Sequence, residues 1–175
     1  MASSERPGIR VLGSLRSADG KGVVRMEDRF DAGIADVWAA LTEPSRLARW
    51  YGEVDGDLRA GGEYRARLLA SGWEGTGRVE ACEPRQRLLL VTRHVRATDE
   101  GVIEVTLGAD GPQVILAWEE RGMPVDHLAA YGAGIQVHVE DLAAHLAGAE
   151  RCDAEARFEE LLPVYQDLAA DIGAL

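Results

Sequence analysis

The sequence predicts an α+β fold in which a curved antiparallel β-sheet wraps around one long helix near the C-terminus. Residues 126–149 are apolar at steps of three and four, which is typical of an amphipathic helix. The middle of the chain alternates between apolar and polar residues in short segments separated by turn sequences, which is typical of antiparallel strands. A straight helix cannot touch a strongly curved sheet everywhere, so this layout also predicts an internal cavity between the sheet and the long helix.

The composition is that of a globular domain, and the net charge disfavours some kinds of binding partner. The 175 residues suit one domain with a sizeable core. The net charge of −11 argues against nucleic acid or an anionic membrane as the main partner, because both attract basic surfaces. Cys82 and Cys152 lie far apart and fit a reducing cytoplasm. The sequence shows no secretory signal and no apolar run of membrane-spanning length, so we expect a cytoplasmic protein without a membrane span.

The N-terminal part is expected to contain an arm, a strand and two short helices. Residues 1–20 are polar and rich in glycine and serine, which predicts a loose arm or a weak extra strand before a domain that covers residues 21–149. Val23–Phe30 alternates and predicts a strand. Ile34–Leu41 and Pro44–Trp50 predict two short helices, because proline disfavours helical geometry in the residue before it and suits the first helical turn.

Five further strands are predicted between the short helices and the long helix. They cover Glu63–Leu69, Trp73–Cys82, Arg87–Val95, Val102–Leu107 and Val114–Glu120. Their short connections carry turn residues, so neighbouring strands should be antiparallel. Gly75 and Gly77 stand inside one of these strands, which indicates strong curvature or the close approach of another element.

The long helix is expected to start at an Asp126 N-cap and to stop at Gly148. Its apolar stripe consists of Leu128, Tyr131, Ile135, Val139, Leu142 and Leu146. Gly132 and Gly134 lie within the helix, where each costs about 1 kcal/mol relative to alanine. We therefore expect something to approach the helix closely, or the helix to bend around something.

Residues 150–175 predict a helical extension. Its apolar residues again recur at steps of three and four, but Pro163 interrupts them, so we expect a kinked helix or two short pieces. This extension is expected either to pack on its own domain, which we favour, or to mediate a homodimer.

The order of these elements and several local motifs resemble a known superfamily. The matching residues are Phe30, Val37 to Thr42, Pro44, Leu47, Trp50, Gly61 to Tyr64, Gly75, Gly77, Val79, Glu83, Pro84, Gly134, His138 and Leu142. The chain is similar to the START-like, or SRPBCC, superfamily with its helix-grip fold (the fold of birch-pollen allergens). It more closely resembles the branch of homologues of the activator of the heat-shock-protein-90 ATPase.

This resemblance implies a hydrophobic cavity that binds a small molecule, often without known catalysis. Some members of the superfamily are lipid carriers or polyketide cyclases, and the branch is named for assisting a chaperone ATPase. Members of the branch usually carry a Gly-Trp pair in the closing helix. Here the pair is Gly134-Ile135, which predicts more room or a differently shaped lid.

Aromatic and polar residues from several predicted elements are expected to meet on the cavity. The candidate ligand-binding residues are Trp50, Tyr64, Trp73, His94, Trp118, Tyr131, Ile135 and His138. They suit a planar or apolar ligand that one or two polar groups orient. We assign no catalytic residue, metal ligand or cofactor, and we expect a binding protein for a small hydrophobic or amphipathic molecule.

Two groups of polar residues leave other functions open. His138, Asp141 and His145 have a helical spacing compatible with metal ligation, but such triples are common on helices and we expect packing or solvation instead. His94, Asp28 and Glu120 lie near strand ends, where two of them meeting in an apolar cavity would permit acid–base chemistry. The alternative function is therefore a polyketide cyclase-like or hydrolase-like enzyme. A third reading is a regulator of a heat-shock-protein ATPase with a chaperone partner.

Overall fold

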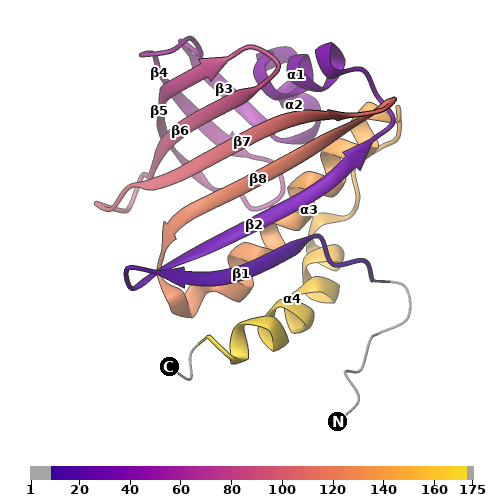
Figure 1. Cartoon of the computed structure of the whole chain (residues 1–175). Coiled ribbons are helices and arrows are strands. Elements are labelled where there is room, and N and C mark those ends of the chain that lie inside the picture. Colours follow the sequence, from indigo (N-terminus) through magenta and orange to yellow (C-terminus); the bar gives the residue numbers. More distant parts are fainter. Residues whose placement is uncertain (1–8, 173–175) are drawn as a thin grey trace.

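An eight-stranded antiparallel sheet forms one wall of the protein, and the helices cover one face of it (Figure 1). The computed structural model describes residues 9–172. The strands are β1 (Gly13–Ala18), β2 (Lys21–Phe30), β3 (Gly52–Gly56), β4 (Glu63–Leu68), β5 (Glu74–Glu83), β6 (Arg87–His94), β7 (Gly101–Asp110) and β8 (Gln113–Met123). Their order across the sheet is β1-β2-β8-β7-β6-β5-β4-β3. An early strand, β2, therefore pairs with the last strand, β8, and brings both ends of the domain together.

The helices follow the predicted order. They are α1 (Ile34–Thr42), α2 (Pro44–Trp50), α3 (Leu128–Leu146) and α4 (Ala154–Ala170), with a 3₁₀ turn, η1 (Val125–His127), before α3. The α+β class, the two short helices and the long helix lying along the curved sheet are confirmed (Figure 1). None of the helices within residues 9–172 is long and apolar enough to cross a membrane.

Of the two strands at the edges of the sheet, one was a predicted alternative and the other was not predicted. Residues 13–18 form β1, so part of the N-terminal arm is an extra strand on β2. Asp19 and Gly20 both have positive φ, which a two-residue hairpin turn of the favoured type requires. At the opposite edge lies β3, which the sequence analysis missed because GEVDG contains a single aliphatic residue.

The long helix begins one residue later than expected. Asp126 belongs to η1, and the residue at the N-cap of α3 is His127, which makes no side-chain capping bond. The far end agrees with the expectation, since Gly148 adopts the left-handed φ of 74° that follows many helices.

The C-terminal segment forms one continuous helix, α4, although Pro163 lies inside it. Asp153 caps its start by accepting a hydrogen bond from the Ala156 amide. The buried side chains Leu161 and Tyr165 face the domain on either side of the proline. Packing on both sides offsets the missing helical hydrogen bond, so of the two predicted alternatives the division into two short pieces does not occur.

One buried hydrogen-bond network joins the N-terminal arm, α3 and α4. The Tyr165 hydroxyl donates to the side-chain oxygen of Gln136 and accepts from the Gly13 amide at 3.1 Å. Gln136 also accepts from the Leu12 amide at 3.1 Å and donates to the Arg10 carbonyl at 2.7 Å. These contacts hold both terminal segments against the helix that closes the sheet (Figure 1).

Candidate functional site

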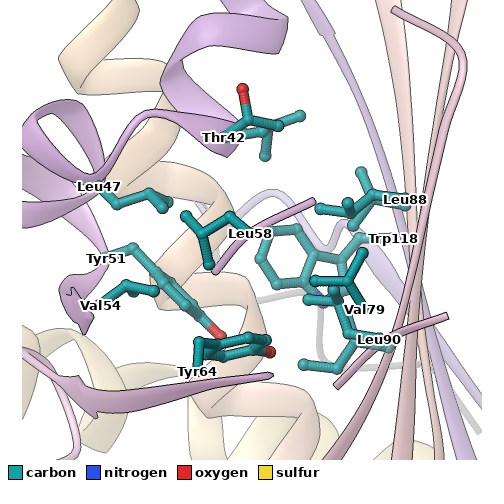
Figure 2. A pocket seen from close by; sticks show the side chains of 13 residues that line it. Thr42, Leu47, Tyr51, Val54, Leu58, Tyr64, Val79, Leu88, Leu90 and Trp118 are labelled. Carbon is teal, nitrogen blue, oxygen red and sulfur yellow. The ribbon is translucent and has the colours of Figure 1, made fainter. Parts of the chain in front are cut away.

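A pocket lies between the sheet and the two short helices (Figure 2). It is lined by Leu41, Thr42, Leu47, Tyr51, Val54, Leu58, Tyr64, Val79, Leu88, Leu90, Ile103, Val105 and Trp118. The cavity volume is about 60 Å³, which is several times the roughly 10–15 Å³ that one buried water needs. The pocket is therefore a narrow apolar slot, and since a cavity of roughly 150 Å³ holds one benzene ring, a larger planar ligand enters it only if the surrounding side chains or helices move.

The sheet wall of the pocket follows from strand alternation. Val105 pairs with both Leu88 and Trp118 across the sheet, so one face of three adjacent strands contributes to the lining. Gly77 makes room for the ring of Tyr64, because a Cβ at Gly77 would lie 2.1 Å from that ring. Gly77, which predicted the close approach of another element, thus leaves space for the Tyr64 ring of the neighbouring strand β4.

Tyr51 is the main aromatic residue on the helical wall. It follows α2 directly, and its ring lies 5.8 Å from that of Trp118 and 5.0 Å from that of His138. Figure 2 shows the hydroxyl end of Tyr51 pointing toward Tyr64, while Thr42 lies at the other end of the pocket. Burial raises the pKa of both tyrosine hydroxyls, so both are neutral hydrogen-bonding groups at physiological pH.

Two of the predicted binding residues, Tyr64 and Trp118, line this pocket. Trp50 is fully buried beneath it, where its indole N–H donates to the Ala40 carbonyl at 2.9 Å. The predicted set contains Trp50 but not its neighbour Tyr51. Because α2 ends at Trp50, the direction of Tyr51 is not set by the helical period, and the sequence carried no direct signal for it.

In the described part of the chain, the other predicted binding residues do not line the pocket. Trp73 and His94 form an edge-to-face pair with ring centres 5.8 Å apart. Tyr131 is 37% exposed on α3, whereas Ile135 and His138 are buried on the same helix. The structure thus separates the predicted set into pocket residues, a strand-end pair and residues of α3.

The pocket is displaced from the position that the sequence analysis expected. It was expected between the sheet and the long helix, but its lining comes from α1, α2, the segment around β3 and strands β4 to β8. The long helix α3 packs directly on β2 and β1, and its buried residues fill that space. The short helices cover the part of the sheet that curves away from α3 (Figure 1), and the pocket lies between them and the sheet.

The three polar residues considered as metal ligands do not form a common site. Burial lowers the pKa of His138 to about 4, so its ring is neutral, and its Nδ1 has no hydrogen-bond partner within residues 9–172. The buried Asp141 accepts from the Cys152 amide at 3.0 Å. His145 accepts from Arg46 at 3.1 Å. In the described part of the chain, no group of three or more such side chains is placed to hold a metal.

Only one of the three acid–base candidates lies beside the pocket. Asp28 is buried but forms an ion pair with Arg10 at 2.7 Å, and His94 accepts from the Arg96 amide at the end of β6. Glu120 accepts from the indole of the pocket residue Trp118 at 3.1 Å. Loss of solvent raises the pKa of Glu120 to about 7.

The fold and the pocket define a helix-grip protein of the START-like superfamily. The family model described as "Activator of Hsp90 ATPase homolog 1-like protein" matches residues 31–147. The chain belongs to this family. A search of curated proteins gave no significant match.

Solved structures show the same fold. CalU16 from Micromonospora echinospora superposes with a TM-score of 0.74 at 23% identity, over 90% of this chain and 96% of CalU16. EF2215 from Enterococcus faecalis, a conserved protein of unknown function, gives 0.66 at 19% identity, over 89% and 91% of the two chains. DynU16, described as a protein of the dynemicin biosynthetic locus, gives 0.69 at 28% identity, over 78% of this chain and 51% of DynU16. The chain thus matches about half the length of DynU16.

Proposed function

We propose that the protein binds a slender hydrophobic or amphipathic small molecule in the pocket beneath α1 and α2. The chemistry of the lining carries this proposal: nine of the thirteen residues are aliphatic, three are aromatic and one is threonine. The Thr42 hydroxyl donates to the Trp38 carbonyl at 2.8 Å and is therefore already engaged. Such a surface favours ligands through burial of apolar area, at about 25 cal/mol per Å².

The hydroxyl groups of Tyr51 and Tyr64 supply the polar contacts in this proposal. Both residues line the pocket, and burial keeps both hydroxyls neutral. A neutral hydroxyl both donates and accepts hydrogen bonds, so the pair would orient one polar group of a bound molecule. The cytoplasmic location, a homodimer and a chaperone partner stay predictions.

The test is ligand binding by a pocket-filling variant and a matched surface variant. Methylnaphthalene is a suitable slender probe, and native mass spectrometry of freshly purified protein would reveal a co-purified ligand. Val105 is 2% exposed in the pocket wall and Val95 is 60% exposed outside it. We expect Val105→Phe to abolish the thermal shift caused by the probe, and Val95→Phe to keep it. Equal responses of the two variants, or no response of the wild type, would overturn the proposal.

An enzymatic function of cyclase or hydrolase type is the second candidate. Its supporting observation is Glu120, a carboxyl with a pKa of about 7 beside an apolar pocket, since general acids and bases work best near the operating pH. The description of DynU16 as part of a biosynthetic locus points the same way. Turnover of a bound ligand that disappears in Glu120→Gln, with binding retained, would favour this candidate over simple binding.

A further inference from the structure

Glu120 lies at the margin of the pocket on the same face of β8 as Trp118. In the sheet it stands opposite Ile103 of β7, another lining residue, and opposite Val24 of β2, which is buried in the core. Residues two apart in a strand point to the same side. The carboxyl of Glu120 is therefore directed to the helix-covered side of the sheet, next to the pocket.

Neighbouring carboxyl groups on the opposite face of the sheet have arginine partners. Glu119 pairs with Arg121 at 2.7 Å, and Glu104 pairs with Arg87 at 2.7 Å. Within residues 9–172, the hydrogen bond recorded for Glu120 is the one from the Trp118 indole. An ionised carboxylate accepts about four hydrogen bonds, so Glu120 keeps most of its capacity for another group.

Among residues 9–172, no positively charged side chain lowers the pKa of Glu120. The hydroxyl groups of Tyr51, Tyr64 and Tyr131 lie near enough that the negative charge of Glu120 contributes to the raised pKa of each. His138, which contacts Tyr51, is neutral above about pH 4. A carboxyl in this setting is costly to ionise unless a cation joins it.

We propose that Glu120 is the polar anchor of the pocket and that the natural ligand joins an apolar body to a protonated amine. This inference rests on the proposed binding function. The amine would pair with the Glu120 carboxylate at the pocket margin, while the apolar body enters the slot. The rings of Trp118 and Tyr51 line the pocket nearby, and aromatic rings attract cations that lie over their faces. The net charge of −11 favours the approach of a cation over that of an anion.

Binding of such an amine depends on pH in a defined direction. The free carboxyl has a pKa of about 7, and an amine of pKa about 9–10 stays protonated throughout the range from pH 5 to pH 8. If the ligand requires the ionised carboxylate, its affinity falls about tenfold for each pH unit below 7 and levels off above it. A neutral ligand of the same shape has no such dependence.

The experiment compares 1-naphthylmethylamine with its neutral analogue 1-naphthylmethanol by calorimetric titration. We expect the amine to bind the wild type at least tenfold more tightly at pH 8, and this preference to vanish in Glu120→Gln, a variant of the same shape. The matched control is Glu119→Gln on the opposite face, which should keep the preference. The neutral analogue should bind all three proteins equally, which also shows that the variants are folded.

Each outcome decides one of the two proposals. If neither probe binds the wild type and the pocket-filling variant changes nothing, the binding function itself fails. If both probes bind equally at pH 8, or Glu120→Gln keeps the preference for the amine, the pocket function stands and the amine anchor is refuted.

Discussion

Gly132 in α3 offers the sharpest test of how the C-terminal extension is held. A Cβ added at Gly132 would lie 2.4 Å from the ring of Tyr165 on α4, whereas a Cβ at Gly134 would meet nothing within 4 Å. Both glycines lie inside the same helix, so alanine should improve helix propensity by about 1 kcal/mol at either position. The two variants therefore differ only in what the new methyl group meets.

The expected difference in stability follows from a comparison of Gly132→Ala with Gly134→Ala. Overpacking a well-packed site costs about 1–3 kcal/mol, and the gain in helix propensity cancels between the two variants. We expect Gly134→Ala to stabilise the protein by about 1 kcal/mol and Gly132→Ala to lie about 1–3 kcal/mol below it. With a urea m-value of about 2 kcal/mol/M, the midpoints of unfolding should differ by about 0.5–1.5 M.

Urea unfolding followed by circular dichroism measures both midpoints, and a third variant supplies the control. In a Tyr165→Leu background the aromatic ring is absent, so Gly132→Ala should become stabilising, as Gly134→Ala is in the wild type. Equal midpoints for Gly132→Ala and Gly134→Ala in the wild-type background would refute the reasoning. The group that the glycines of α3 predict to approach this helix closely would then not be the ring of Tyr165.

Three further predictions concern buried contacts. Gly77→Ala should push the ring of Tyr64 into the pocket, destabilise the fold by about 1–3 kcal/mol and weaken binding of a naphthyl probe. Tyr165→Phe should cost about 1–3 kcal/mol in urea unfolding, because the oxygen of Gln136 loses its hydroxyl donor. His138→Gln should flatten the pH dependence of stability between pH 6.5 and pH 4, where the wild type should lose about 3 kcal/mol from this group.

The direction of the pH effect follows from where the proton binds. The pKa of His138 falls from 6.5 to about 4 on folding, so between these values the unfolded chain binds the proton and the folded chain does not. The contribution of His138 to stability is therefore complete above pH 6.5 and is lost as the pH falls toward 4.

For Gly77→Ala the control is Gly108→Ala in β7, where a Cβ meets nothing within 4 Å. Wild-type stability that equals that of His138→Gln at every pH, or probe binding unaffected by Gly77→Ala, would contradict these expectations.

Periodicity predicted the fold because each main element buries one face. The alternation in β2 and β5 remains visible as a buried face in the structure. In α3 all residues from Ile135 to Val139 are buried, because the helix packs on β2 and on α4, whereas Tyr131 of the predicted stripe is exposed. The misses have local causes: β3 is too short and polar to show a pattern, and Pro163 is tolerated because Leu161 and Tyr165 anchor α4 on both sides. Such compensation by tertiary packing is not encoded in the residues next to the proline.

The site was harder to predict because a pocket and a packed core have the same sequence pattern. Tyr64 was placed by strand alternation, which fixes the side of the sheet on which a residue lies, whereas Trp118 was chosen as an aromatic residue of a strand with ambiguous alternation. Alternation does not reveal which inward residues are covered by α3 and which by α1 and α2. Tyr131, Ile135 and His138 of α3 were therefore expected at the pocket, although Tyr131 is exposed and the other two are buried outside the pocket lining.

The position of the pocket under α1 and α2 also determines what must move when a larger ligand enters. The two short helices are joined at Glu43, and the Trp50 indole ties them through its bond to the Ala40 carbonyl. The long helix α3 is held more firmly, by β2 on one side and by Tyr165 of α4 through Gln136. Widening the slot thus requires displacement of the short helices and Tyr51 and leaves α3 in place. A ligand that fills the pocket should accordingly slow amide exchange in α1 and α2 more than in α3.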